Sequence, residues 1–224
     1  MIRDFEQGPF WLRKPLDPMI EEDDPDDPEE PDKEDEGKGG AGDDQLLKLM
    51  LKTRTILVSS PVSDKLYQKV VQQLTLLEAQ DANAPIHVYV NSPGGSADSG
   101  FAIYDAMRFV TCPIVTICNG ICASAAVIIF LGGDKDKRVS LPNSRFLLHQ
   151  PSTAGQGTAS DLSITAREII KIREKYNGIV AEATGKSIDK VTKDSDRDFW
   201  LSATEAVEYG LASKVITEKK ELPR

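Results

Sequence analysis

The sequence is poor in the residues that build disulfide and metal sites. Its 224 residues include only three cysteines and two histidines. The cysteines, Cys112, Cys118 and Cys122, form neither a disulfide framework nor a CxxC pair. Two histidines are too few for an ordinary transition-metal centre. We therefore expect no metal site and a reducing, intracellular location, the cytoplasm.

Basic charge and nucleotide-binding glycine motifs are also lacking. The net charge is −9 and the pI is about 4.9, which argues against a nucleic-acid binder. Neither GxxxxGK[ST] nor GxGxxG occurs, so we expect no nucleotide cofactor. The first 20 residues hold no apolar stretch typical of a secretory signal. Residues 109–133 lack charge, but Pro113 and Asn119–Gly120 interrupt them. They indicate a buried strand, a turn and a buried helix rather than a membrane span.

The acidity belongs to one segment. Residues 21–44 hold 14 acidic and 2 basic residues, whereas the other 200 residues hold 22 and 25. Ala41 is the only apolar residue of this segment, which cannot bury enough surface to offset its ordering entropy. We predict a disordered run within an N-terminal extension, residues 1–45, that is either a solvated spacer or a docking segment for a partner.

From residue 46 the pattern is that of an α/β domain. Four strands are predicted, at residues 55–58, 86–90, 114–117 and 146–148. Helices are predicted to begin at Ser63, to follow residue 96, to cover about 160–182, and to run from Ser202 to Gly210. This alternation predicts a largely parallel sheet with crossover helices over residues 46–218, followed by a tail at 219–224.

The two histidines differ in their positions. His87 alternates with Ile86 and Val88 on a strand, which favours a solvated or hydrogen-bonded structural role. His149 follows a strand directly and precedes a proline-terminated loop, where α/β sheets place functional groups. An ordinary structural role remains open for His149 as well.

Two small-residue turns could carry chemistry. Gly94 and Gly95 follow a strand and lead into a helix, so they form either a simple tight turn or exposed amides that hold an oxyanion. Ser124 begins another helix, either as an N-cap or as a nucleophile beside the amide of Ala125. Cys122 is a rival nucleophile, but its apolar surroundings should raise its pKa and leave it inert.

A nucleophilic serine needs a base and an orienting carboxylate. His149 is the better-placed base. Spacing alone does not choose among the downstream acids, which are Asp161, Asp194, Asp196 and Asp198.

Four motifs together resemble the proteolytic subunits of the Clp protease family. They are NSPGGS (91–96), GICASA (120–125), LHQP (148–151) and SDRDFWLSATEAVEYGL (195–211). The resemblance covers about residues 46–218. It implies a fold of the ClpP/crotonase type, two stacked seven-membered rings, hydrolysis of unfolded polypeptides and an AAA+ ATPase partner.

Position by position, the resemblance assigns roles to seven residues. Ser124 matches the family's nucleophile, His149 its base and Asp198 its orienting carboxylate. Gly95 and Ala125 match the residues whose amides form the oxyanion hole. Asp196 and Arg197 match positions that make contacts between the two rings.

Three segments depart from the family pattern. Residues 1–45 replace the short segment that lines the axial pore, residues 152–154 stand where a glycine pair is usual, and Ala126 replaces a common glycine. We expect the acidic runs of several copies to gather at the pore and to favour basic peptides at low salt. The alternatives are a non-catalytic ring subunit and an acyl-CoA enzyme of the crotonase type.

Overall fold

The computed structural model describes residues 41–152 and 156–223. In chain order its elements are α1 (Ala41–Lys52), β1 (Thr55–Val58), α2 (Asp64–Gln80), β2 (Ile86–Ser92), α3 (Ala97–Phe109), β3 (Ile114–Ala123), α4 (Ala125–Leu131), η2 (Lys135–Lys137), β4 (Arg138–Ser140), β5 (Arg145–Leu148), α5 (Ala159–Thr184), α6 (Ile188–Asp194), β6 (Phe199–Ser202), α7 (Ala203–Tyr209), β7 (Lys214–Val215) and η3 (Lys219–Glu221). The four predicted strands and the predicted helices are all present.

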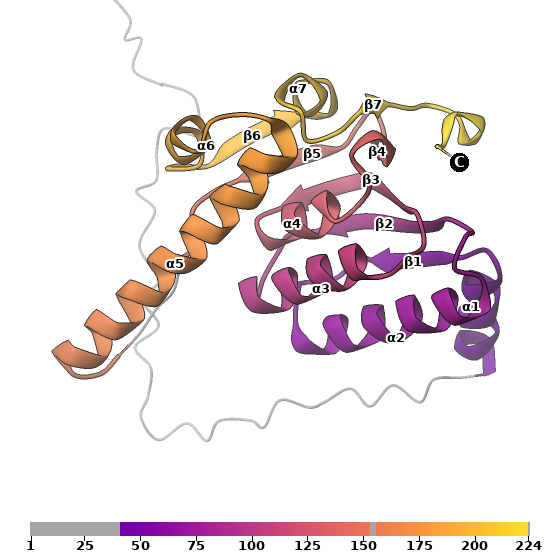
Figure 1. Ribbon diagram of the computed structural model, residues 1–224, viewed down its shortest axis with the longest axis horizontal. Helices are drawn as coiled ribbons and strands as arrows, with labels where there is room; N and C mark the ends of the chain where they lie inside the picture. The colour runs from indigo at the N-terminus through magenta and orange to yellow at the C-terminus, as the bar shows by residue number, and fades with distance from the viewer. Residues whose placement is uncertain (1–40, 153–155, 224) are drawn as a thin grey trace, which may run out of the picture. The chain divides into compact units, whose positions relative to one another are not determined.

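The sheet is parallel except at one pair of strands. Strands β1, β2, β3, β4 and β7 lie side by side in that order, and β5 adds to β3. Strand β6 pairs with β5 in the antiparallel sense. Parallel neighbours need crossover connections, and Figure 1 shows α2, α3 and α4 on one face of the sheet. The predicted α/β architecture with a largely parallel sheet is confirmed.

Helix ends follow the expected capping chemistry. The Ser63 hydroxyl accepts a hydrogen bond from the Leu66 N–H at the start of α2. Helix α7 begins with a reciprocal capping box between Ser202 and Glu205 and ends at Gly210, which has a φ of 97°. Only glycine adopts such a left-handed end without strain. The predicted boundaries of α7 are therefore confirmed.

Strand β3 does not end at Asn119–Gly120, as the turn signal predicted. It continues to Ala123 and changes partners on the way, pairing with β4 over Thr116–Cys118 and with β5 over Ile121–Ala123. The Asn91 side-chain oxygen accepts a hydrogen bond from the Ile121 N–H, 3.0 Å away. This contact from β2 stabilises an irregular strand where local preference favours a turn.

Most of the uncharged stretch 109–133 is buried, although Phe109 at its start is exposed. The stretch supplies β3 and α4, and all seven residues of α4 are buried. Within the described ranges, no helix is long and apolar enough to cross a membrane.

The structure differs from the prediction at the start of the domain and adds a packed segment at its end. Helix α1 begins at Ala41, so the prediction of disorder was wrong for residues 41–44; acidic residues are favourable in the first turn of a helix. Residues 1–40, with most of the acidic run, and residues 153–155 lie outside the described residues. At the other end, Leu222 packs against a small apolar cluster on the sheet that includes Ile117 and Ile216.

Candidate active site

Ser124 lies where β3 ends and α4 begins. Its backbone has a φ of 55° and a ψ of −126°, and its N–H donates to the Leu147 carbonyl of β5 at 2.9 Å. Among the described residues, its side chain makes no capping hydrogen bond to α4. The N-cap alternative is therefore not observed, and the hydroxyl oxygen is left for other chemistry.

The chain segment before α3 approaches Ser124 closely. A Cβ atom on Gly94 would lie 2.6 Å from both the Ala123 carbonyl oxygen and the Ser124 Cβ atom. Real Cβ contacts are essentially never this short. Gly94 also has a φ of 91°. Both its conformation and its contact therefore require glycine.

Two backbone N–H groups near Ser124 are candidates to hold an oxyanion. The Val62 N–H donates to the Gly94 carbonyl at 2.8 Å, and the Ser96 N–H donates to the Val62 carbonyl at 2.9 Å. In such a parallel bridge, the residue between the two bonds directs its own N–H away from the neighbouring segment. Gly95 is that residue. Ala125 is the first residue of α4, so its N–H has no acceptor within the helix, and both residues line one pocket.

His149 and Asp198 meet across the antiparallel pair of strands. His149 follows β5 and Asp198 precedes β6, which pairs Leu148 with Phe199. The Asp198 Oδ1 atom lies 3.8 Å from His149 Nδ1, and the two side chains are 65% and 29% exposed. The distance permits an ionic contact but is longer than a hydrogen bond.

The other candidate acids have different partners. Asp161 accepts hydrogen bonds from the Thr158 N–H and hydroxyl as part of the α5 capping box. Asp194 is bonded to Lys190 and to the Tyr209 hydroxyl. Asp196 lies 3.8 Å from a guanidinium nitrogen of Arg173. Of the four acids, only Asp198 lies within 4 Å of a His149 nitrogen in the described part of the chain.

The remaining candidates, His87 and Cys122, are not among the residues that line the pocket. Burial, and then the charges of Lys219 and Arg54, lower the pKa of His87. Cys122 is completely buried. Burial raises its thiol pKa well above the ordinary value, which confirms the expected environment of Cys122.

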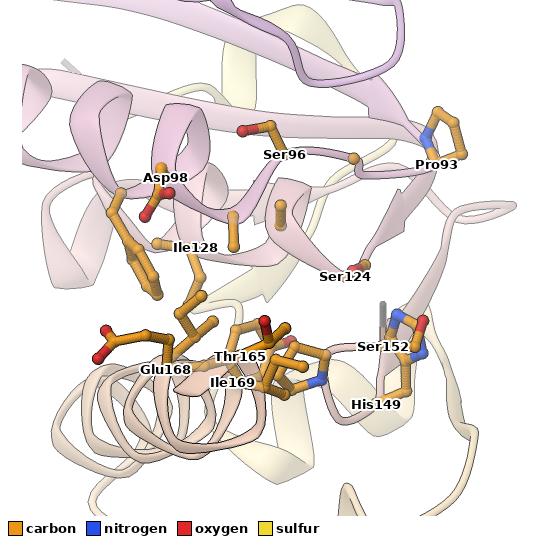
Figure 2. Close-up of a pocket in the computed structure, with 17 residues that line it drawn as sticks. Pro93, Ser96, Asp98, Ser124, Ile128, His149, Ser152, Thr165, Glu168 and Ile169 are labelled. Atoms are coloured by element: carbon orange, nitrogen blue, oxygen red, sulfur yellow. The ribbon is translucent and has the colours of Figure 1, made fainter. Parts of the chain in front are cut away.

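A pocket of about 580 Å³ extends from Ser124 and His149. In Figure 2, these two side chains lie at one end, and Asp98 and Glu168 lie at the other. Apolar side chains of α3, α4 and α5 also line the pocket: Phe101, Ile128, Ile169, Ile172 and Tyr176. This apolar wall was not predicted from the sequence. Its signal was the helical spacing of the last three residues, which looks the same for a pocket as for a core.

No group of three or more metal-ligating side chains occurs among the described residues. The chemistry available at this site is that of a hydroxyl, an imidazole, a carboxylate and two backbone amides. A serine-type acyl-transfer site uses the same set of groups.

Comparisons with known proteins agree on one family. A family model described as Clp protease matches residues 38–219. An ATP-dependent Clp protease proteolytic subunit 2 from Treponema denticola is 46% identical over 181 residues, which are 81% of this chain and 90% of that protein. The protein of the same description from Pseudomonas aeruginosa is 46% identical over 183 residues, with 82% and 90% covered. The solved structure of a ClpP1 mutant from Listeria monocytogenes is similar with a TM-score of 0.73 and 38% identity, and covers 78% of this chain and 98% of that one.

Proposed function

The chain belongs to the Clp protease family, and on this premise we propose that it is a serine endopeptidase with Ser124, His149 and Asp198 as its catalytic triad. A proteolytic subunit of this family is a serine-type peptidase, and the fold agrees with that of a solved relative. The observation that carries the residue assignment is the contact between His149 and Asp198 at one end of the pocket that Ser124 also lines.

The proposed mechanism follows from the orientation of the imidazole. Because Nδ1 of His149 faces Asp198, Nε2 is the nitrogen left to accept the proton of the Ser124 hydroxyl. Ser124 Oγ attacks the carbonyl carbon of the peptide bond, and His149 then protonates the leaving amine. Water then attacks the acyl-enzyme. His149 takes a proton from this water and returns a proton to Ser124 Oγ as the ester bond breaks.

The two amides beside Ser124 suit the negative charge that develops on the carbonyl oxygen. We assign the N–H groups of Gly95 and Ala125 to this oxyanion hole. Fixed backbone donors need no reorganisation during the reaction, and loss of one such donor costs about 10²–10³ in kcat in a serine protease.

Assembly into rings is a further part of the proposal. The isolated chain exposes large apolar side chains on several elements, a pattern that marks interaction surfaces. They include Leu46 and Leu49 on α1, Ile164 and Ile170 on α5, and Phe109 at the end of α3. We propose that these surfaces are covered in two stacked seven-membered rings, and that an AAA+ ATPase supplies unfolded polypeptides to the chamber in the cytoplasm.

Labelling by a fluorophosphonate probe tests the proposed nucleophile. The assembled protein should form one adduct, and peptide mapping should locate it on Ser124. Ser124→Ala should remove both the label and peptide cleavage, whereas Ser152→Ala, at another serine that lines the pocket, should retain both. A labelled Ser152, or an assembled protein without any adduct, would contradict the assignment.

The non-catalytic ring subunit makes a different prediction. In such a subunit, His149 and Asp198 would stay 3.8 Å apart and would never form a hydrogen bond. A purified homo-oligomer would then neither react with the probe nor cleave small peptides. Cleavage of small peptides by the pure homo-oligomer rejects this alternative. The acyl-CoA enzyme predicts turnover of an acyl-CoA without peptide cleavage.

A further inference from the structure

The two cysteines of β3 lie closer together than their separation in sequence implies. Strand β2 pairs Val90 with Cys118 and Ser92 with Cys122. Two residues of β2 thus span the same length as four of β3, and the surplus residues form a bulge. Two residues of a strand span roughly 6.5 Å, against roughly 13 Å for four. The Cα atoms of the two cysteines are therefore separated by about the shorter distance.

Both cysteine side chains point to the same side of the sheet. Val90 and Ser92 are two residues apart on a strand, so they share a face, and aligned residues of neighbouring strands share it with them. Cys118 and Cys122 are both completely buried. A disulfide requires a Cα separation of about 4.4–6.8 Å, and the register places the pair within the upper part of this range.

The two thiols also differ in acidity. Hydrogen bonding with the Cys122 thiol lowers the pKa of Cys118, and the Ser144 hydroxyl and the Gly120 backbone act in the same direction. Burial raises the pKa of Cys122. Of the two sulfurs, Cys118 is thus the better source of a thiolate. Cys112, the third cysteine, lies elsewhere, with its Sγ atom 3.4 Å from a guanidinium nitrogen of Arg54.

We propose that Cys118 and Cys122 form a dithiol site that hydrogen peroxide converts to an intrachain disulfide beneath Ser124. The Cys118 thiolate attacks one peroxide oxygen, the O–O bond breaks, and the released hydroxide takes a proton to become water. The sulfur of Cys122 then attacks the resulting Cys118 sulfenic acid. The S–O bond breaks, and the departing hydroxide leaves as water with the Cys122 proton. Two thiols are oxidised and one peroxide is reduced to two waters.

The consequence for activity rests on the proposed function. Residues 123–125 follow Cys122 directly, so a disulfide that shortens the bulge displaces the nucleophile and the Ala125 amide together. A displacement of about 1 Å can cost 10²-fold in rate. We expect the oxidised protein to lose peptidase activity by about tenfold to a hundredfold and to regain it when a thiol reductant opens the disulfide.

The Asn119–Gly120 bond between the two cysteines allows the proposed disulfide to be mapped chemically. The folded, assembled protein is treated with hydrogen peroxide, alkylated, denatured and cut with trypsin after Arg108 and Lys135. Hydroxylamine then cleaves the Asn119–Gly120 bond, which lies between the two cysteines. The fragments stay joined if Cys118 is bonded to Cys122 and separate if both thiols are free. The Cys112→Ser variant removes the third thiol from the same peptide.

Two results support the proposal: the joined fragments from folded protein, and activity in Cys122→Ala that peroxide leaves unchanged while the wild type loses it reversibly. Alkylated, separable fragments from folded protein would overturn it, as would a bond that forms only after denaturation. The fragment map needs no enzymatic activity. An untreated protein that is inactive and unlabelled would therefore refute the proposed function while the dithiol site is still tested.

Discussion

The Asp198 carboxylate reaches the His149 imidazole across two antiparallel strands, with 3.8 Å between Oδ1 and Nδ1. The carboxylate is more than half exposed, so burial of its side chain does not hold the pair in place. Asp198 precedes β6, which pairs with β5. The ring of the next residue, Phe199, packs against Tyr209 with 5.5 Å between the ring centroids. A movement of about 1 Å would convert the contact into a hydrogen bond. We therefore expect the alignment of the proposed triad to depend on β6.

The Asp198→Asn variant tests this contact. It keeps the size of the side chain but removes the charge that stabilises the protonated imidazole. We expect kcat/KM for a small peptide to fall by about 10²–10⁴-fold. Asp196→Asn, at an acid that faces Arg173 instead, is the matched control and should retain activity in any assembled protein. Equal losses in the two variants would contradict the assignment.

The Gly94→Ala variant tests the close approach of the α3 turn to Ser124. Its new methyl group would meet the Ala123 carbonyl and the Ser124 Cβ atom, and the left-handed backbone adds strain. We expect a loss of about 2 kcal/mol in the free energy of unfolding and at least a tenfold loss of kcat/KM. Gly178→Ala is the control, because nothing lies within 4 Å of a Cβ atom there in the middle of α5. It should gain about 0.5–1 kcal/mol, as thermal unfolding would measure.

Arg54 is the expected weak point of the β1–α2 region. Its guanidinium donates to the carbonyls of Leu77 and Asp81 at the end of α2, and to those of Ala84 and Pro85 beyond it. Removing the guanidinium leaves several partly buried carbonyl oxygens without a hydrogen-bond donor. We expect Arg54→Ala to lower the free energy of unfolding by about 3 kcal/mol in urea denaturation.

A lysine cannot reproduce these four contacts, since it has a point charge in place of a planar fork. Arg54→Lys should therefore recover less than half of the loss. The exposed Arg108, at the end of α3, provides the control, and its replacement by alanine should stay within about 0.5 kcal/mol of the wild type. An Arg54→Lys variant as stable as the wild type would show that charge alone matters.

Glu205 should make the start of α7 sensitive to acid. Hydrogen bonds from the Ser202 backbone N–H and hydroxyl lower its pKa below the ordinary value of 4.5. The unfolded chain therefore takes up a proton first, and stability is lost as the pH falls from about 4.5 through the folded pKa. Glu205→Gln should unfold at a lower temperature than the wild type at pH 7, and the difference should shrink in acid. Glu208→Gln removes an exposed charge from the same helix and is the control for the change in net charge.

The acidic run can be tested without disturbing α1. Deleting residues 21–40 removes most of the predicted charge cluster and leaves the helix that begins at Ala41. If these charges screen the entrance to the chamber, the deletion should weaken the salt dependence of cleavage and reduce the preference for basic over acidic peptides. Identical salt dependence in the two proteins would make the run a spacer.

Local signals explain what could be predicted of the fold. The apolar stripe of α2, the alternation in β2, and the capping box at Ser202 each depend on residues a few positions apart. Strand β3 could not be predicted in full, because its continuation past Gly120 depends on Asn91 from β2 and on the Ser144 hydroxyl, which accepts the Gly120 N–H. Such long-range contacts outweigh the turn preference of an Asn–Gly pair.

The same distinction applies to the site. Ser124 and His149 could be proposed as candidates from the sequence, because Ser124 begins a predicted helix among small residues and His149 directly follows a predicted strand. The partner of His149 could not be chosen by spacing, since Asp161, Asp194 and Asp196 differ from Asp198 mainly in what they contact. Only the pairing of β5 with β6 brings Asp198 to the imidazole.

The left-handed backbone of Ser124 sets chemistry against stability at a single position. A non-glycine residue with a φ of 55° costs about 1–3 kcal/mol, and a glycine there would recover part of it. The same glycine would remove the hydroxyl. The sequence that is most stable in this fold therefore differs from the sequence proposed to be active. Selection for stability alone would favour glycine at position 124 and produce a protein without the proposed nucleophile.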